Sequence, residues 1–378
     1  MASTYLTRTI STNNPTGRKT MTLSVWLKRG TVSATNMIFA TGTGSERDMI
    51  LFESDGKLQF SRYNGSYLYQ LKTNRQFRDP NAWLHLVFVY DSTQSTSSNR
   101  LKIYVNGVQE TSFATASYPS QDYQSNYSQS TYTQTLGRDT DGNFAFDGCM
   151  SHVHYIDGTA LTPSTFGSTD ATTGEWKINT SPSVTYGTNG FFLLKDDNSN
   201  LDRGGSNNFT INGTLTKIED NPSNNFATWY ADSFDKGNQV SFSNGNTTTA
   251  DAGGTSDYDP KAWTTFGANT GKYYCEMKLA AFTTNRSYRA GVWFTEGNFS
   301  HEANANCFSG VKYTTTGNAV TIYSFGSDVQ SGLASFSAGD ILGIAVDIDN
   351  GTIQYYRNGS TYGSQITGLS SNFSGKSM

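Results

Sequence analysis

The stretch 101-LKIYVNGVQE-110 has the features of a β-hairpin, and a second stretch, 351-GTIQYYRNGSTYG-363, repeats them near the other end of the chain. In each, a β-rich run leads to Tyr, one further residue and an Asn-Gly pair, and a polar run follows. Asn and Gly accept the positive φ angles that both central residues of a type I′ turn require. The pairs Asn106-Gly107 and Asn358-Gly359 therefore predict two tight hairpins and raise the question of two related domains.

The composition predicts an all-β protein. The chain has 378 residues, enough for two domains with separate cores. It contains 37 Gly, 22 Tyr and 23 Phe, with only 15% charged residues, a mixture typical of many short strands joined by turns. No window of ten or more residues keeps a 3.6-residue apolar period, so we expect little helix.

The charge pattern excludes two classes of partner. The formal net charge is -4, and no cluster of Lys and Arg suggests binding to nucleic acid. The most apolar runs, 83-WLHLVFVY-90 and 341-ILGIAVDI-348, are too short to span a bilayer, so we expect no membrane insertion. The start, 1-MASTYLTRTI-10, lacks the pattern of a secretory signal, which predicts synthesis and folding in a cytoplasm.

Apolar runs and turn clusters alternate along both halves of the chain, as in antiparallel β-sandwiches. Between residues 202 and 229 the sequence is polar and loop-rich but keeps enough Phe, Ile and Leu to pack against a neighbouring surface. We therefore predict two sandwiches in tandem, residues 1–201 and 230–378, joined by a docked, loop-rich connector at 202–229.

Several of these runs resemble known families. The first half resembles the laminin-G-like branch of the concanavalin A-like sandwiches, through 21-MTLSVWLKRG-30, 82-AWLHLVFVYD-91, 101-LKIYVNGVQE-110 and 146-FDGCMSHVHYIDGTALTP-163. The second half resembles a SPRY domain through 271-GKYYCEMKL-279, 289-RAGVWF-294 and 336-FSAGDILGIAVDIDNGTIQYYRNGS-360. The resemblance implies two concanavalin A-like, jelly-roll-type sandwiches. SPRY domains carry a further strand beyond the point where this sequence stops, which implies a fragment or a sheet completed by another chain.

The middle of the chain carries a more particular resemblance. The runs 166-FGSTDATTGEW-176, 185-TYGTNGFFLLKDDNSNL-201, 207-NNFTINGTLT-216 and 220-DNPSNNFATW-229 join the two halves as in virion structural proteins of tailed phages of marine bacteria. This implies a non-enzymatic fibre, tail or capsid-decoration subunit in the virion, in homo-oligomeric form and in contact with other virion subunits. Host attachment through a surface glycan is the expected role. The alternatives are a purely architectural subunit and a polysaccharide depolymerase.

The segment 117-SYPSQDYQSNYSQSTYTQT-135 is the candidate contact surface. Tyr with Ser, Asn and Gln is the mixture that binding loops use, because the flat ring has few rotamers and the small polar groups adapt their hydrogen bonds. A contact with another subunit, a contact with a glycan and a solvated loop are all compatible with it. The four candidate residues are Tyr118, Tyr123, Tyr127 and Tyr132.

A calcium site is the one candidate cofactor site. In 137-GRDTDGNFAFDG-148, Asp139, Asp141 and Asn143 alternate as oxygen ligands do in calcium loops, although a polar turn would use the same residues. His152 and His154 alternate on one strand, but nothing in the spacing brings His85 to them.

The sequence provides no catalytic residue. A retaining glycosidase needs two carboxyl groups about 5 to 5.5 Å apart. The nearest pair along the sequence, Glu53 and Asp55, fits a hairpin turn better.

Overall fold

The computed structural model of the protein is built almost entirely of β-strands, as predicted. It describes residues 4–80, 82–172, 174–195, 199–218, 220–223, 227–230, 240–243, 246–251, 262–264, 267–282, 287–294 and 308–373. Helical segments in these ranges have three or four residues each: η1 (Ser97–Asn99), η2 (Pro163–Thr165), η4 (Thr316–Asn318) and α1 (Ser370–Phe373). None of the described helices is long and apolar enough to cross a membrane.

The chain divides into two compact units, Met1–Thr265 and Phe266–Met378. Each unit has a buried apolar core of its own. The predicted boundaries at residues 201 and 229 both lie within the first unit. Residues 374–378, which contain the end of the second predicted domain, lie outside the described residues.

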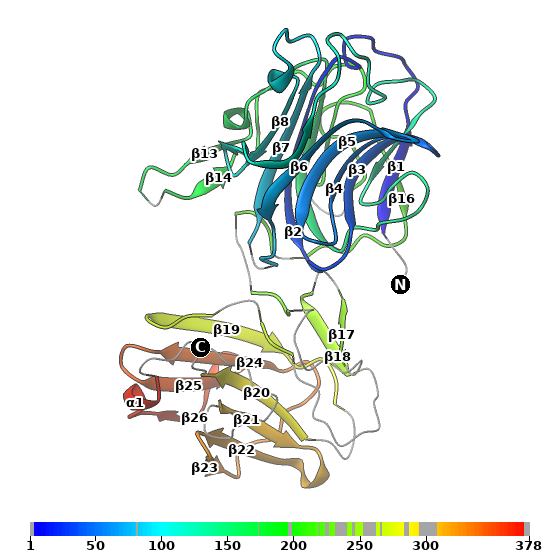
Figure 1. Ribbon diagram of the computed structural model, residues 1–378. Coiled ribbons are helices and arrows are strands. Elements are labelled where there is room, and N and C mark those ends of the chain that lie inside the picture. Colours follow the sequence, from blue (N-terminus) through cyan, green and yellow to red (C-terminus); the bar gives the residue numbers. More distant parts are fainter. Residues whose placement is uncertain are drawn as a thin grey trace. The chain divides into compact units, whose positions relative to one another are not determined.

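The first unit is a sandwich of two antiparallel sheets (Figure 1). In sheet order, the eight-stranded sheet contains β10 (Phe113–Ser117), β6 (Tyr67–Gln76), β5 (Lys57–Asn64), β4 (Glu46–Phe52), β3 (Asn36–Thr43), β11 (Thr133–Leu136), β1 (Tyr5–Thr9) and β16 (Thr210–Asn212). The six-stranded sheet contains β15 (Phe191–Leu193), β12 (Gly148–Asp157), β2 (Thr20–Arg29), β7 (Leu84–Asp91), β8 (Leu101–Val105) and β9 (Val108–Gln109). Small hairpins complete the unit: β13 (Gly167–Thr169) with β14 (Trp176–Ile178), and β17 (Val240–Ser243) with β18 (Thr248–Asp251).

The two Asn-Gly pairs form the hairpins that the sequence predicts, and they anchor themselves in the same way. Asn106 and Gly107 have φ angles of 48° and 82°, and Asn358 and Gly359 have 51° and 79°. The Asn106 carboxamide oxygen accepts a hydrogen bond of 2.8 Å from the backbone nitrogen of His85 on the adjacent strand. The Asn358 oxygen accepts the equivalent bond, also 2.8 Å, from Ile341. Each Asn therefore ties its turn to the neighbouring strand.

The hairpin of β8 and β9 also supports a covering segment. Within β8, Leu101, Ile103 and Val105 alternate into the core. Trp176, from the β13–β14 hairpin, lies against the turn so closely that a Cβ atom on Gly107 would come within 2.4 Å of its ring. The indole nitrogen of Trp176 donates to Nδ1 of His85 at 2.9 Å. The β13–β14 hairpin therefore packs on the outer face of the six-stranded sheet.

A row of polar residues crosses the eight-stranded sheet. One residue from each of six adjacent strands is paired with the next, in the order Arg8, Gln134, Thr41, Asp48, Arg62 and Tyr69. Asp48 and Arg62 are both buried and form an ion pair of 3.4 Å. We call these six residues the inner polar row, because Tyr69 and the phenylalanine rings that stack on Arg8 belong to the sandwich core.

Part of the predicted connector is integrated into the first unit. Its strand β16 pairs with β1, with Ile211 opposite Leu6. Further along, the buried Asp220 accepts a bond of 3.1 Å from the indole nitrogen of Trp83 and lies 3.0 Å from the Nζ atom of Lys28. A buried carboxylate that has both a cation and a hydrogen-bond donor fixes the position of its segment.

The second unit is a smaller sandwich of two antiparallel sheets (Figure 1). One contains β19 (Lys272–Lys278), β24 (Ile341–Asp347), β25 (Thr352–Arg357) and β26 (Ser360–Ile366), and the other contains β20 (Ser287–Trp293), β21 (Phe308–Thr314), β22 (Ala319–Ser324) and β23 (Ser327–Ser331). Ile344 and Tyr355 from the first sheet and Val311 and Ile322 from the second belong to one core. Together the two units confirm the predicted fold class.

Candidate functional site

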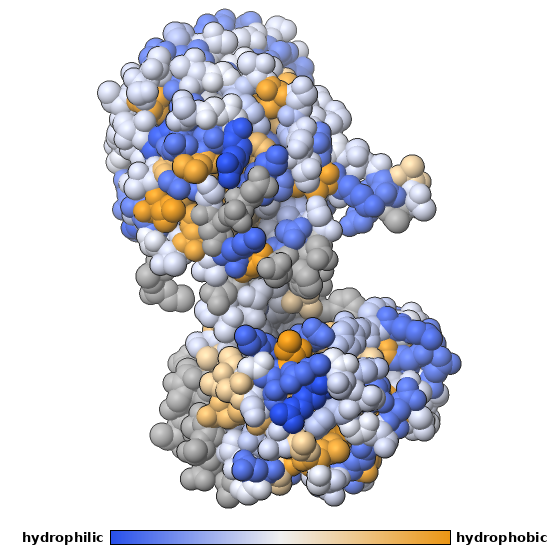
Figure 2. All heavy atoms as spheres, turned by 180° about the vertical axis from the view of Figure 1, so that it is seen from behind, coloured by the Kyte–Doolittle hydropathy of each residue, from blue (hydrophilic) through white to orange (hydrophobic). Residues whose placement is uncertain are grey.

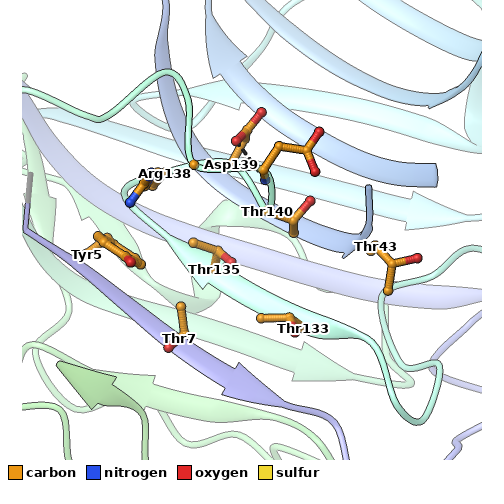
Figure 3. Close-up of a pocket in the computed structure, with 11 residues that line it drawn as sticks. Tyr5, Thr7, Thr43, Thr133, Thr135, Arg138, Asp139 and Thr140 are labelled. Carbon is orange, nitrogen blue, oxygen red and sulfur yellow. Dashed lines mark hydrogen bonds between the residues drawn. The ribbon is translucent and has the colours of Figure 1, made fainter. Parts of the chain in front are cut away.

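A hollow of about 450 Å³ lies on the outer face of the eight-stranded sheet (Figure 3). Its floor is formed by strands β1, β3 and β11, and one side by the loop that follows β11. The lining residues are Tyr5, Thr7, Gly42, Thr43, Thr133, Thr135, Arg138, Asp139, Thr140, Asp141 and Gly142. Figure 3 shows Tyr5 and Thr7 on one strand and Thr133 and Thr135 on its neighbour. We call this feature the threonine hollow.

Strand alternation explains why threonines gather there. Leu6 and Leu136 face each other across β1 and β11, and both belong to the core. Successive side chains of a strand point to opposite faces, so Thr7, paired with Thr135, points outward. The hydroxyl groups of Thr43, Thr133 and Thr135 make no hydrogen bond with any residue that the structure describes. Thr43 is exposed and Thr133 is half-buried, so their hydroxyl groups can bind polar groups of a ligand, whereas Thr135 is only 1% exposed.

Arg138 provides a positively charged group in the lining of the hollow. Its guanidinium carbon lies 4.7 Å from the centroid of the Tyr5 ring, a cation–π arrangement. No carboxylate or carbonyl among the described residues accepts a hydrogen bond from this guanidinium, and its Nε atom is buried without a partner. A planar guanidinium that lies against an aromatic ring and keeps free N–H groups is suited to a ligand with oxygen acceptors.

The predicted calcium residues lie beside the hollow, but a cation from the protein is already among them. The Oδ1 atom of the buried Asp139 accepts hydrogen bonds from the backbone nitrogens of Asp141 and Asn143, at 2.9 and 2.8 Å. Arg47 is ion-paired with both carboxylates, and its Nη1 atom lies 3.3 Å from Asp139. No group of three His, Cys, Asp or Glu among the described residues could hold a metal ion. This arrangement favours the alternative of a polar turn.

The Tyr-rich segment differs from the expected contact surface at one residue. Tyr127 is fully buried, and its ring packs between Phe39, Phe60 and Tyr90 of the core. The prediction that Tyr127 contacts a ligand or partner is therefore wrong, because the ring fills space between the two sheets. Tyr123 is half-buried and packs edge-to-face on Tyr69.

Tyr118 and Tyr132 are also half-buried, and the Tyr132 hydroxyl lies 3.4 Å from Glu46. For Tyr118, Tyr123 and Tyr132 a contact role stays a prediction. Backbone contacts hold the centre of the segment, since the backbone nitrogen of Asn126 donates to the buried Asp48 carboxylate at 2.6 Å.

His85, His154 and Asp55 make packing or hydrogen-bond contacts that serve the fold. His85 is stacked between Trp26 and Trp176, and burial lowers its pKa to about 3. His154 is stacked on Phe192 with 3.9 Å between ring centroids. Asp55 accepts a bond from the backbone nitrogen of Lys57 at 3.1 Å, as the predicted hairpin turn requires.

Sequence reasoning missed the threonine hollow. The alternating threonines of 131-TYTQT-135 were the available signal, since they mark one polar face of a strand. The pairing of β11 with β1 and β3 joins segments that are far apart in the sequence, and no local pattern specifies it.

Comparison with known protein families finds a match over part of the first sandwich. Residues 3–165 match the family described as the concanavalin A-like lectin/glucanases superfamily. The match confirms the predicted concanavalin A-like, laminin-G-like domain in the first half. No curated protein matches the chain in a sequence comparison.

Solved structures with similar folds include a putative carbohydrate binding protein from Bacteroides ovatus, with 19% identity and a TM-score of 0.36, over 57% of this chain and 58% of that one. The chain thus spans little more than half of that protein. The CBM40 of a Ruminococcus gnavus sialidase bound to α2,3-sialyllactose has 13% identity and a TM-score of 0.30, over 43% of this chain and 94% of its own.

Domains LG4-5 of the mouse laminin α1 chain have 10% identity and a TM-score of 0.31, over 98% of this chain and 76% of theirs. At these scores the similarities to solved structures support no conclusion about function. The identification rests on the family match, which makes residues 3–165 similar to the concanavalin A-like lectin/glucanases superfamily.

Proposed function

We propose that the first unit is a non-catalytic carbohydrate-binding domain and that its binding site is the threonine hollow. The observation that carries the proposal is the Arg138 guanidinium, which lies against Tyr5 without an acceptor, beside threonine hydroxyls that have no hydrogen-bond partner among the described residues. Sugars have an apolar ring face and a rim of hydroxyl groups, and these match an aromatic side chain beside hydroxyl and guanidinium groups. The family match at residues 3–165 supports the same proposal.

Both carboxylates of the hollow support binding rather than hydrolysis. Asp139 and Asp141 are ion-paired with Arg47, and Asp139 also accepts two backbone N–H groups. Both carboxylates are thus engaged by groups of the protein, whereas a retaining glycosidase needs two carboxyl groups that face the scissile bond. The positive charge of Arg47 beside these groups also leads us to propose that binding requires no calcium ion.

Affinity electrophoresis through gels that contain neutral or acidic polysaccharides tests this proposal. The protein should be retarded by at least one polysaccharide, and Arg138→Ala should weaken the retardation about tenfold, as expected for loss of a hydrogen bond from a charged donor. Thr133→Val, which removes a half-buried hydroxyl group of the hollow, should weaken it less. Thr115→Val, at an exposed position on the far edge strand β10 of the same sheet, is the matched control and should change nothing.

Two further outcomes are decisive. Retardation that is equal for the wild type and for Arg138→Ala would exclude the threonine hollow as the site. Retardation should also persist in a chelator such as EDTA. Its loss there would show that calcium is needed and would support Asp139, Asp141 and Asn143 as ligands.

We also propose that the protein acts on the surface of a phage particle, as a fibre, tail or capsid-decoration subunit that attaches to a host glycan. The sequence resemblance of residues 166–229 to virion proteins supports this setting. Homo-oligomeric assembly and contacts with other virion subunits belong to the same proposal. The copy number of the chain in purified particles, measured by quantitative mass spectrometry, is the deciding observation.

A further inference from the structure

The second unit has a groove of about 340 Å³ on the outer face of one of its sheets. Strands β19, β24 and β25 form it, and Gln365 of β26 lies at its border. All lining residues belong to the second unit, so the groove is independent of the threonine hollow.

Ala345 of the central strand lines the floor of this groove, and Gly343 on the same strand lies under Tyr274 and Tyr356. Leu342, Ile344 and Val346 point into the core, and so the alternate residues Gly343 and Ala345 point outward. A Cβ atom on Gly343 would lie 2.5 Å from the Tyr274 hydroxyl and 3.1 Å from Cβ of Tyr356. Any larger residue here would displace the Tyr274 side chain.

Two tyrosines line the groove. Tyr274 on β19 and Tyr356 on β25 meet edge-to-face, with 5.9 Å between ring centroids. Tyr274 is 54% exposed, a large exposure for an aromatic side chain on a sheet face. Its hydroxyl donates to Glu276 at 2.7 Å, and this hydrogen bond fixes the ring and raises the pKa of Tyr274 to about 12. The ring is thus held in place with its hydroxyl protonated.

The polar groups of the groove carry no net charge. Lys272 and Asp347 form an ion pair of 3.0 Å. The Gln354 amide donates to the backbone carbonyl of Tyr355 at 2.8 Å, which fixes the orientation of its side chain. The exposed Gln365 amide has no hydrogen-bond partner among the described residues. A ligand that matches this lining is itself uncharged and rich in hydrogen-bonding groups.

We infer that this groove is a second carbohydrate site, for a neutral glycan whose sugar ring packs on Tyr274 and Tyr356 beside Ala345. The charge balance of the lining selects against acidic sugars. An extended peptide would pair with the free edge of a sheet, since its backbone hydrogen bonds cannot be satisfied on a sheet face. Sugar hydroxyls, in contrast, match the amides and the ion pair at the border of the groove.

The test uses the full-length chain in affinity electrophoresis with amylose, xylan, a mixed-linkage β-glucan and a neutral galactan. All variants are made in an Arg138→Ala background, which weakens the threonine hollow, so that a further loss of retardation in a second-unit variant is due to a site other than that hollow. At least one of the four polysaccharides should retard this chain. Tyr274→Ala and Gly343→Val should each weaken the retardation about fivefold to tenfold, the first by removing an aromatic ring that lines the groove and the second by displacing that ring.

Three controls separate binding from folding. Tyr323→Ala, on the other sheet of the second unit, should leave the retardation unchanged. Gln365→Ala changes an exposed residue, so the temperature of the thermal transition should stay the same. Retardation should still weaken about threefold. This variant therefore tests the site even if Gly343→Val destabilises the sheet. Absence of retardation of the Arg138→Ala chain by all four polysaccharides would overturn the inference, and so would retardation that neither Tyr274→Ala nor Gln365→Ala weakens. Retardation that does not change between the wild type and Arg138→Ala, but falls in Tyr274→Ala, would overturn only the proposal for the first site.

Discussion

At the residue scale, Asp48 and Tyr127 show what composition could not predict. Tyr118, Tyr123, Tyr127 and Tyr132 occupy similar Ser/Gln-rich surroundings, yet Tyr127 alone of the four lies in the core. It enters because Asp48 accepts the backbone N–H of Asn126 and so holds the segment between the sheets. Asp48 lies on a strand far away in the sequence, and no local signal reports this contact.

Asp48→Ala should be among the most destabilising single changes in the first unit. Burial raises the pKa of the Asp48 carboxyl, and Arg62 together with hydrogen bonds from Tyr69 and Asn126 opposes the shift. In either charge state the carboxyl group is the acceptor for three buried donors. Its removal leaves them unsatisfied at a cost of about 3 kcal/mol, which a urea titration monitored by tyrosine and tryptophan fluorescence would measure.

Glu46→Ala is the matched control for this change, because Glu46 lies on the same strand, contacts Arg62 at 3.8 Å and is 40% exposed. An exposed ion pair contributes about 1 kcal/mol or less. Equal destabilisation by the two variants would contradict a structural role of the buried Asp48.

At the element scale, the hairpins are the part of the fold that the sequence predicts best. Both Asn-Gly turns occur where the local pattern puts them, since the positive φ angles depend on the two residues themselves. The strand alternation of 101-LKIYV-105 was likewise readable, as the buried Leu101, Ile103 and Val105 show. The threonine hollow was not, because three strands must first be paired before their outward residues become neighbours.

The two Asn-Gly turns allow one comparison, between a Cβ atom added in open space at Gly359 and one added against Trp176 at Gly107. Gly359→Ala should cost about 1 to 2 kcal/mol, the penalty of a left-handed backbone, because nothing lies within 4 Å of the added Cβ atom. Gly107→Ala should cost more, because the same penalty is joined by a clash with Trp176. Thermal unfolding of both variants measures the difference.

The Trp176 contact gives a second measurement. Gly107→Ala should shift the tryptophan emission to longer wavelength, since Trp176 must move away from the turn, while Gly359→Ala should not. Equal losses of stability together with unchanged emission in both variants would contradict the packing of Trp176 on this hairpin.

At the scale of the whole molecule, two separate cores account for the fold. The buried residues of the first core come from the eight- and six-stranded sheets and the segments beside them, and those of the second come from the two four-stranded sheets and the segments beside them. The family match ends at residue 165, whereas the first unit uses later strands, including β15 and β16, to complete its sheets. Sequence similarity thus locates the centre of this sandwich but not its full extent.

Two cores predict two calorimetric transitions. Ile103→Ala, in the first core, and Ile344→Ala, in the second, each remove a side chain that is at most 1% exposed. Each should cost about 2 to 5 kcal/mol and lower one transition by several degrees without moving the other. A single transition that both variants lower equally would show that the units unfold as one.

The inner polar row has a consequence for how the binding face can change. A slip of one residue along any of its six strands would turn buried groups such as Asp48 and Arg62 toward solvent and break their ion pair. Strand alignment is thus fixed from inside the sandwich, by residues that never meet a ligand. Residues that point outward from this sheet do not take part in aligning the strands. Examples are Thr7, Thr133 and Thr135. Substitutions there can alter ligand preference while the scaffold stays the same, so this sheet can acquire new specificities by mutation.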